Sequence, residues 1–206
     1  MPRIVEIDID PHHEGLKTFL EQSVAAARAN KDADKFLTYK PLHGKAGRAY
    51  ILLRKEGKGS PLAAAHGKEK AEALAKAAKG GVKSRGSVEY EEVAAHGKHD
   101  KPAPYLVAVA VEPGSNSGGS ELSKHLKDAN AASPVTYRAL RAKKSGPSLV
   151  LLPIKSLSDV EEKGHLNKPR LTSHLGEEKA EKVATALKGR KPAMSILRYV
   201  PEYSNP

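Results

Sequence analysis

The chain has 206 residues, of which 39% are hydrophobic and 4% aromatic, and it carries a formal net charge of +11. Because it has no cysteine, disulfide bonds and thiolate metal sites are excluded. No stretch approaches the roughly 18 apolar residues of a membrane span, and the first residues lack the apolar core of a signal peptide. We therefore expect a cytoplasmic protein whose charge favours a polyanionic or acidic partner.

The first half of the chain predicts the element order β-α-β-β-α-β. Alternating apolar and acidic residues predict a strand over residues 4–10. Apolar residues at three-and-four spacing predict an amphipathic helix over residues 14–30. Two strands that form a hairpin, a second helix that ends at a pair of glycines and a last strand follow, and we place them at residues 36–42, 49–55, 67–79 and 87–93.

The second half predicts the same order of elements. Its apolar runs are typical of strands, and we place these at residues 105–111, 135–140, 149–154 and 193–200. Its helices are expected at residues 121–131 and 176–188. The repeat is visible in the letters themselves, because residues 67–80 and 176–189 are largely the same in the same order.

A β-α-β-β-α-β unit is typical of a ferredoxin-like fold, with four antiparallel strands and both helices on one face. We therefore predict an α+β protein with an internal duplication, in which two tandem ferredoxin-like units pack together. The first unit covers residues 1–95, residues 96–103 form a linker, and the second unit covers residues 104–206 with an insertion near residues 156–168. Tyr39 and Tyr137 occupy matching places in the two halves, and we expect both to be packing residues.

Basic side chains gather in and beside the predicted turns. Lysine and arginine interleaved with glycine can approach a phosphate backbone and release its counterions. The candidate nucleic-acid-binding residues are Lys45, Arg48, Lys83, Arg85, Arg138, Arg141, Lys143, Lys144, Lys188, Arg190 and Lys191. RNA-recognition domains carry two or three stacking aromatic residues in their third strand. This chain offers a single tyrosine there, Tyr50, which argues against a domain that reads RNA sequence.

Histidines are the candidate catalytic residues. His12 and His13 follow two acidic residues, which suggests metal binding or acid–base chemistry, but adjacent histidines in an extended segment point in opposite directions. No zinc-ligand spacing is present, so we expect no metal and no cofactor. The candidates for a general base are His12, His43, His66 and His174.

Three functions remain open. The first is binding of nucleic acid through its phosphate backbone, with RNA slightly favoured over DNA, without catalysis. The second is a metal-independent endoribonuclease with a histidine general base. In its tandem architecture the chain is similar to CRISPR repeat-processing endoribonucleases, although its Lys188–Pro192 loop holds a single glycine where theirs holds several. The third is an interaction or inhibitor module that binds an acidic protein.

Overall fold

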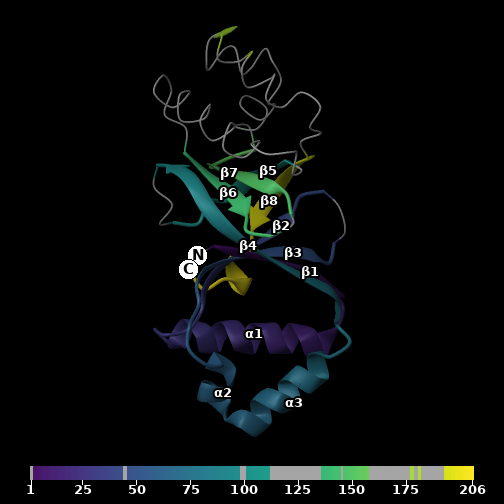
Figure 1. Cartoon of the computed structure of the whole chain (residues 1–206). Coiled ribbons are helices and arrows are strands. Elements are labelled where there is room, and N and C mark those ends of the chain that lie inside the picture. Colours follow the sequence, from purple (N-terminus) through teal and green to yellow (C-terminus); the bar gives the residue numbers. More distant parts are fainter. Residues whose placement is uncertain are drawn as a thin grey trace. The chain divides into compact units, whose positions relative to one another are not determined.

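The computed structural model describes residues 2–43, 46–97, 101–111, 136–144, 146–157, 177–178, 181 and 193–206 (Figure 1). The described elements, in chain order, are β1 (Arg3–Ile9), α1 (Glu14–Ala29), β2 (Lys35–Pro41), β3 (Arg48–Lys55), α2 (Pro61–His66), α3 (Lys68–Ala78), β4 (Val82–His96), β5 (Tyr105–Val111), β6 (Tyr137–Ala142), β7 (Ser148–Ile154), β8 (Ala193–Tyr199) and the 3-10 turn η1 (Pro201–Tyr203). The chain divides into two units, Met1–Val88 with Arg198–Pro206, and Glu89–Leu197.

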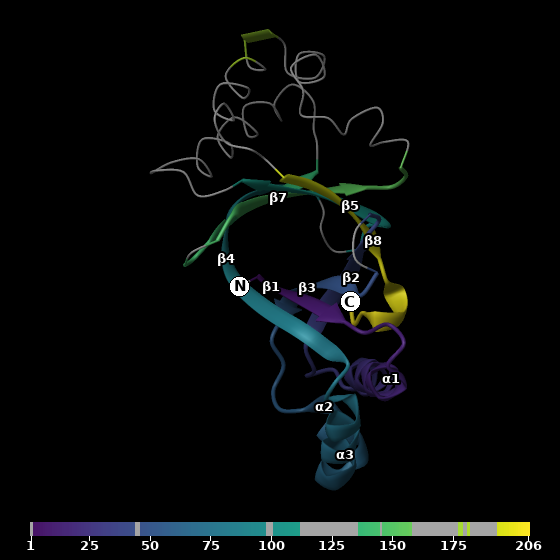
Figure 2. The ribbon, with the colours of Figure 1, turned by 90° about the vertical axis from the view of Figure 1, so that its right-hand side faces the viewer.

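In the first unit, β3 is the middle strand of an antiparallel sheet. β1 lies on one side of it, with Val5 opposite Ile51, and β2 lies on the other, with Leu37 opposite Leu52. Helix α1 packs beneath this sheet, and α2 and α3 lie beyond it (Figures 1 and 2). The helix buries an apolar stripe that includes Leu16 and Val24, as the three-and-four spacing requires.

The predicted strands and helices of the first half are present, with boundaries that differ by a few residues. Two differences stand out. A short helix, α2, precedes α3 and begins with Pro61 after Ser60, whose side chain accepts a hydrogen bond from the Ala63 N–H. This serine cap followed by proline is a common helix start that the sequence analysis did not use. The last strand, β4, has 15 residues rather than the shorter span expected.

The second unit has its own apolar core. β7 pairs antiparallel with β5 on one side and with β6 on the other. Val107, Val109, Tyr137, Ala139 and Val150 form the centre of this core, and each is less than a tenth exposed. In the first unit Tyr39 is likewise 2% exposed and its ring lies 5.5 Å from that of Tyr199. The expectation that Tyr39 and Tyr137 are packing residues is thus confirmed.

The predicted fold class is wrong. Two tandem ferredoxin-like units would each hold a separate four-stranded sheet. The hydrogen-bonded strand order is instead β1-β3-β2-β8-β5-β7-β6-β4, that of a closed eight-stranded barrel. The later part of β4 pairs antiparallel with β6, with Glu91 opposite Arg141, and β8 lies between β2 and β5.

The barrel closes because strands at the edge of an open sheet carry unpaired hydrogen-bonding groups. A strand edge that presents unpaired N–H and C=O groups is satisfied by pairing, and the 15 residues of β4 are enough to serve more than one partner. Local periodicity reports whether a segment is extended and which face it buries, but it does not report which strand lies beside it.

Several expected features lie outside the described residues. These include the helix expected at residues 121–131, the insertion near residues 156–168 beyond Leu157, and most of the helix expected at residues 176–188, of which residues 177, 178 and 181 are described as helical. In the described part of the chain, no helix is both long enough and apolar enough to cross a membrane.

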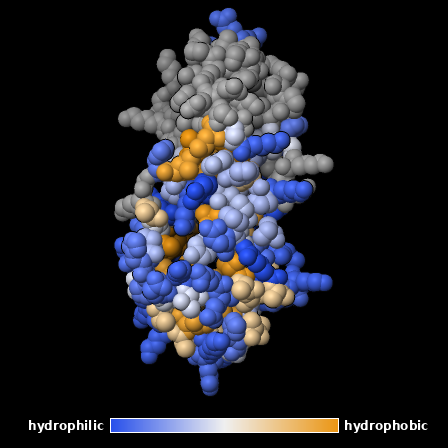
Figure 3. All heavy atoms as spheres, turned by 180° about the vertical axis from the view of Figure 1, so that it is seen from behind, coloured by the Kyte–Doolittle hydropathy of each residue, from blue (hydrophilic) through white to orange (hydrophobic). Residues whose placement is uncertain are grey.

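The surface of the described residues matches the composition. Figure 3 shows a face on which hydrophilic side chains predominate and apolar areas are small and separate. Among the described residues, the large hydrophobic side chains that are exposed are Val82 and Leu157.

Candidate functional site

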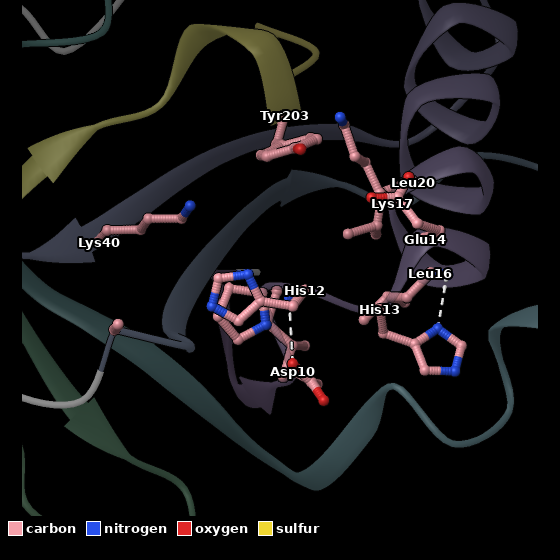
Figure 4. A pocket seen from close by; sticks show the side chains of 12 residues that line it. Asp10, His12, His13, Glu14, Leu16, Lys17, Leu20, Lys40 and Tyr203 are labelled. Carbon is pink, nitrogen blue, oxygen red and sulfur yellow. Dashed lines mark hydrogen bonds between the residues drawn. The ribbon is translucent and has the colours of Figure 1, made fainter.

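A cavity of about 400 Å³ lies within the first unit, where the end of β1, the start of α1, the end of β2 and η1 meet (Figure 4). We call it the His12 pocket. Its lining residues are Ile9, Asp10, Pro11, His12, His13, Glu14, Leu16, Lys17, Leu20, Lys40, Ala46 and Tyr203. The lining therefore mixes apolar side chains such as Leu16 and Leu20 with charged and polar ones such as Asp10, His12 and Lys40.

Asp10 and His12 form the turn that leads from β1 into α1. Pro11 ends the strand because it has no N–H for the ladder. The backbone N–H of His12 donates to Asp10 Oδ1 at 3.0 Å, and the backbone N–H of Asp10 donates to the Gly81 carbonyl at 2.7 Å. The first of these bonds holds the pKa of the Asp10 carboxyl below its ordinary value of 3.8, and the charge of nearby Lys83 adds to the effect.

His13 has a structural role at the start of α1. Its Nδ1 accepts a hydrogen bond from the Leu16 N–H at 3.1 Å, which satisfies one of the unpaired donors of the first helical turn. An added Cβ at Gly81 would lie 2.7 Å from Leu16 Cβ, so glycine is needed where β4 begins against this cap. Because Nδ1 of His13 is engaged as an acceptor, His12 is the imidazole of the pair that is available to a ligand.

Lys40 and Tyr203 form the opposite wall of the pocket. Nζ of Lys40 lies 5.6 Å from the centroid of the Tyr203 ring, within the range of a cation–π contact. Both side chains are half-buried, and among the described residues no carboxylate pairs with Lys40. Figure 4 shows the lysine and the tyrosine facing the same hollow as His12. Neither residue was among the candidates predicted from the sequence.

Most of the predicted nucleic-acid-binding residues that the structure describes are held in ion pairs with glutamates of neighbouring strands. These pairs are Arg48 with Glu6 at 3.2 Å, Arg138 with Glu92 at 2.6 Å, Arg141 with Glu91 at 3.1 Å, and Lys143 with Glu89 at 4.0 Å. Opposite charges across an antiparallel pair stabilise it modestly. A phosphate group would have to compete with these glutamates for each of the cations.

The other candidates are scattered or undescribed. Lys83 and Arg85 lie exposed on the first part of β4, and Lys144 follows β6. His43 is exposed in the turn after β2, and His66 ends α2. Neither histidine lines the His12 pocket. Lys45, His174, Lys188, Arg190 and Lys191 lie outside the described residues.

Within the described ranges, no three histidine, aspartate or glutamate side chains lie together as a metal ion would require. The functional groups that line the His12 pocket include the imidazole of His12, the carboxylate of Asp10, the ammonium group of Lys40 and the phenol of Tyr203, beside apolar side chains.

Comparison with known proteins bears on the fold. No protein-family model matches the chain, and no curated protein does. Among solved structures, a putative monooxygenase from Fusobacterium nucleatum is similar with a TM-score of 0.61 at 9% identity, covering 96% of this chain and 91% of that one. An anthrone oxidase-like protein is similar with a TM-score of 0.56 at 13% identity, covering 97% and 91%. A putative monooxygenase from Lactobacillus acidophilus gives 0.55 at 9%, covering 96% and 92%.

At these identities the likeness shows the fold. It agrees with the closed strand order and overturns the expected tandem ferredoxin-like repeat. None of these three descriptions mentions nucleic acid, so the comparisons give the expected nucleic-acid interface no support.

Proposed function

We propose that this chain binds a small planar acid in the His12 pocket, either a phenol or a ketone with an acidic methylene group, and withdraws its proton at His12. The observation that carries the proposal is a 400 Å³ cavity in which an imidazole and an ammonium group meet beside apolar side chains. Cavities of about 300–1,000 Å³ are typical of small-molecule sites.

The roles follow from the chemistry of each group. A neutral imidazole is the usual general base near neutral pH. Asp10 stays ionised, because its depressed pKa lies far below neutrality, and its Oδ1 accepts the His12 backbone N–H at 3.0 Å, which fixes the turn that carries the imidazole. The ammonium group of Lys40 favours the anion that the ligand becomes.

The similar structures described as monooxygenases and as anthrone oxidase-like suggest an oxidation as the reaction class. A methylene group next to a carbonyl loses one proton to His12, and the resulting carbanion reduces O₂. The peroxide formed at that carbon takes the proton back from His12, and the resulting hydroperoxide then loses water, so that the methylene becomes a carbonyl. The substrate supplies the electrons and O₂ is the oxidant, so this route needs no bound cofactor.

The test is oxygen consumption with anthrone as the probe, measured with an electrode and by the appearance of anthraquinone. The wild-type chain should exceed the buffer rate, and His12→Gln should lower the rate about 10²-fold or more. His43→Gln is the matched control, because it removes an exposed imidazole outside the pocket, and it should leave the rate unchanged. A wild-type rate equal to that of buffer, or equal rates for His12→Gln and wild type, would contradict the proposal.

Nucleic-acid binding, endoribonuclease activity and inhibition of an acidic protein stay predictions from the sequence. Fluorescence anisotropy of labelled RNA at about 50 and 200 mM salt tests the two nucleic-acid functions, because binding through the phosphate backbone falls steeply with salt. A gel of the same RNA reports any cleavage.

A further inference from the structure

Residues 200–206 fold back on the first unit and continue the pairing of β2. The Val200 N–H donates to the Thr38 carbonyl at 2.9 Å. Phe36 and Asn205 exchange two backbone hydrogen bonds, at 2.8 and 3.0 Å. The segment is therefore anchored at both of its ends by the same strand.

Two buried polar side chains add to this anchoring. Ser204 is 0% exposed and Asn205 is 2% exposed. Ser204 Oγ accepts from the Thr38 N–H at 2.9 Å and donates to the Val200 carbonyl at 2.8 Å. Asn205 Nδ2 donates to the Asp34 carbonyl at 2.6 Å and to the Ala27 carbonyl at 3.3 Å. Buried polar groups that are fully paired specify one conformation, because any other leaves them without partners.

Helix α1 holds the segment from its other side. Arg28 donates from Nε to the Ser204 carbonyl at 3.0 Å and from Nη2 to the Pro201 carbonyl at 2.5 Å. Thr38 Oγ1 donates to the Tyr203 carbonyl. The backbone is thus held two residues before Tyr203, at Tyr203 and at the residue after it.

This leaves the Tyr203 ring in a fixed position on the wall of the His12 pocket, with Lys40 at its face. We infer that the 200–206 segment is the specificity-determining wall of this pocket. The Tyr203 ring selects ligands with a planar face, and Lys40 selects those with an acidic group. The inference rests on the proposed binding of a small planar acid in the pocket.

Contact area and charge are the physical basis of this selectivity. An aromatic ring offers a planar ligand an offset or edge-to-face contact beyond simple burial, and a puckered saturated ring of the same size cannot make it. An ammonium group with no carboxylate partner among the described residues attracts a ligand anion more strongly than a neutral hydroxyl. Because the wall is held on both sides, ligand binding does not have to order it first.

Calorimetric titration of the full chain with three probes tests this division of roles. The probes are 1-naphthoate, which is planar and anionic, decahydro-1-naphthoate, which is anionic but puckered, and 1-naphthalenemethanol, which is planar but neutral. Wild type should bind 1-naphthoate most tightly. Tyr203→Leu should lose about three- to tenfold of the preference for the planar over the puckered acid, and Tyr203→Phe should keep it.

Lys40→Met should lose the preference for the acid over the alcohol while keeping the preference for planarity. Tyr50→Leu is the matched control, because Tyr50 is a half-buried tyrosine of β3 that does not line the pocket, and it should change neither preference. Circular dichroism of each variant checks that it is folded. If Tyr203→Leu is unfolded, Tyr203→Phe and Lys40→Met decide.

The outcomes separate the two proposals. If wild type binds none of the probes, this inference falls, and the oxygen-consumption test with anthrone decides the proposed function separately. If wild type binds 1-naphthoate but the preferences are the same in wild type, Tyr203→Leu and Lys40→Met, the inference alone is overturned. Loss of planarity preference in Lys40→Met, or in Tyr203→Phe, also overturns the assignment of that preference to the tyrosine ring.

Discussion

Asn205→Ala is the substitution whose effect the structure defines most sharply. The side chain is 2% exposed and donates to the Asp34 carbonyl at 2.6 Å and to the Ala27 carbonyl at 3.3 Å. Each neutral hydrogen bond contributes about 0.5–1.5 kcal/mol net, so the loss of both should lower the free energy of unfolding by about 1–3 kcal/mol. The Ala27 carbonyl still accepts a hydrogen bond from the Asn30 N–H at 3.2 Å in the variant. Most of the lost free energy therefore comes from the Asp34 carbonyl, which loses the hydrogen bond from Asn205.

Urea unfolding followed by circular dichroism measures this loss, and the slope of free energy against urea should stay that of the wild type. The control is Glu202→Ala, because Glu202 is an exposed residue of the same segment and surface substitutions are usually within about 0.5 kcal/mol. A loss below about 0.5 kcal/mol for Asn205→Ala would refute the anchoring of the 200–206 segment. The same variant should also weaken binding of 1-naphthoate, because Tyr203 is then less firmly held.

Three further predictions concern single titratable side chains. His13→Ala should cost about 1 kcal/mol in urea unfolding, because the Leu16 N–H loses its side-chain acceptor and keeps only the His13 carbonyl at 3.1 Å. His13→Asn should recover most of this loss, and equal losses for the two variants would argue against capping. An NMR titration should give Asp10 a pKa below 3.8. The ionised carboxyl therefore stabilises the fold above its unfolded-state pKa, and this stabilisation is lost as the pH falls through its native-state pKa. A measured pKa at or above 3.8 would exclude the hydrogen bond from the His12 N–H. Burial raises the pKa of Tyr137 above 10.0, so its contribution to stability is full below about pH 10 and is lost as the pH rises through the native pKa. The ultraviolet titration curve of Tyr137→Phe should lack one late-ionising phenol that the wild-type curve shows. Identical curves for the two proteins would contradict the prediction.

The local structure of the first half was predictable because it depends on neighbours in sequence. The spacing of Leu16 and Val24 is that of one helix face, and the alternation of β1 is that of a half-buried strand. The start of α2 at Ser60 and Pro61 carried an equally local signal, which the sequence analysis passed over. The predicted fold class was wrong because the fold depends on which strands lie side by side. In two separate ferredoxin-like units β4 and β8 would pair only within their own halves, whereas here β4 lies beside β6 and β8 lies between β2 and β5.

The site was predictable only in part. His12 was a candidate from its acidic neighbours, and the structure places it in a cavity beside Asp10. His13 was considered together with His12 for metal binding or acid–base chemistry but was not a general-base candidate, and the helix that begins one residue later uses its Nδ1 as a cap. Tyr203 carried no signal at all, because a tyrosine near a proline in a polar segment is unremarkable as a pattern.

By itself, the sequence determined the secondary structure of the first half, the burial of Tyr39 and Tyr137, and the positive charge, because periodicity, residue size and charge are properties of short stretches of chain. Only the tertiary structure decided the closed order of the strands and the pairing of arginines with glutamates on neighbouring strands. It alone also decided the meeting of Tyr203, Lys40 and His12 around one cavity. These outcomes depend on hydrogen bonds and contacts between residues that are far apart in the chain. Which residues pair is decided by the whole fold, because strand edges and buried polar groups must all find hydrogen-bond partners at once.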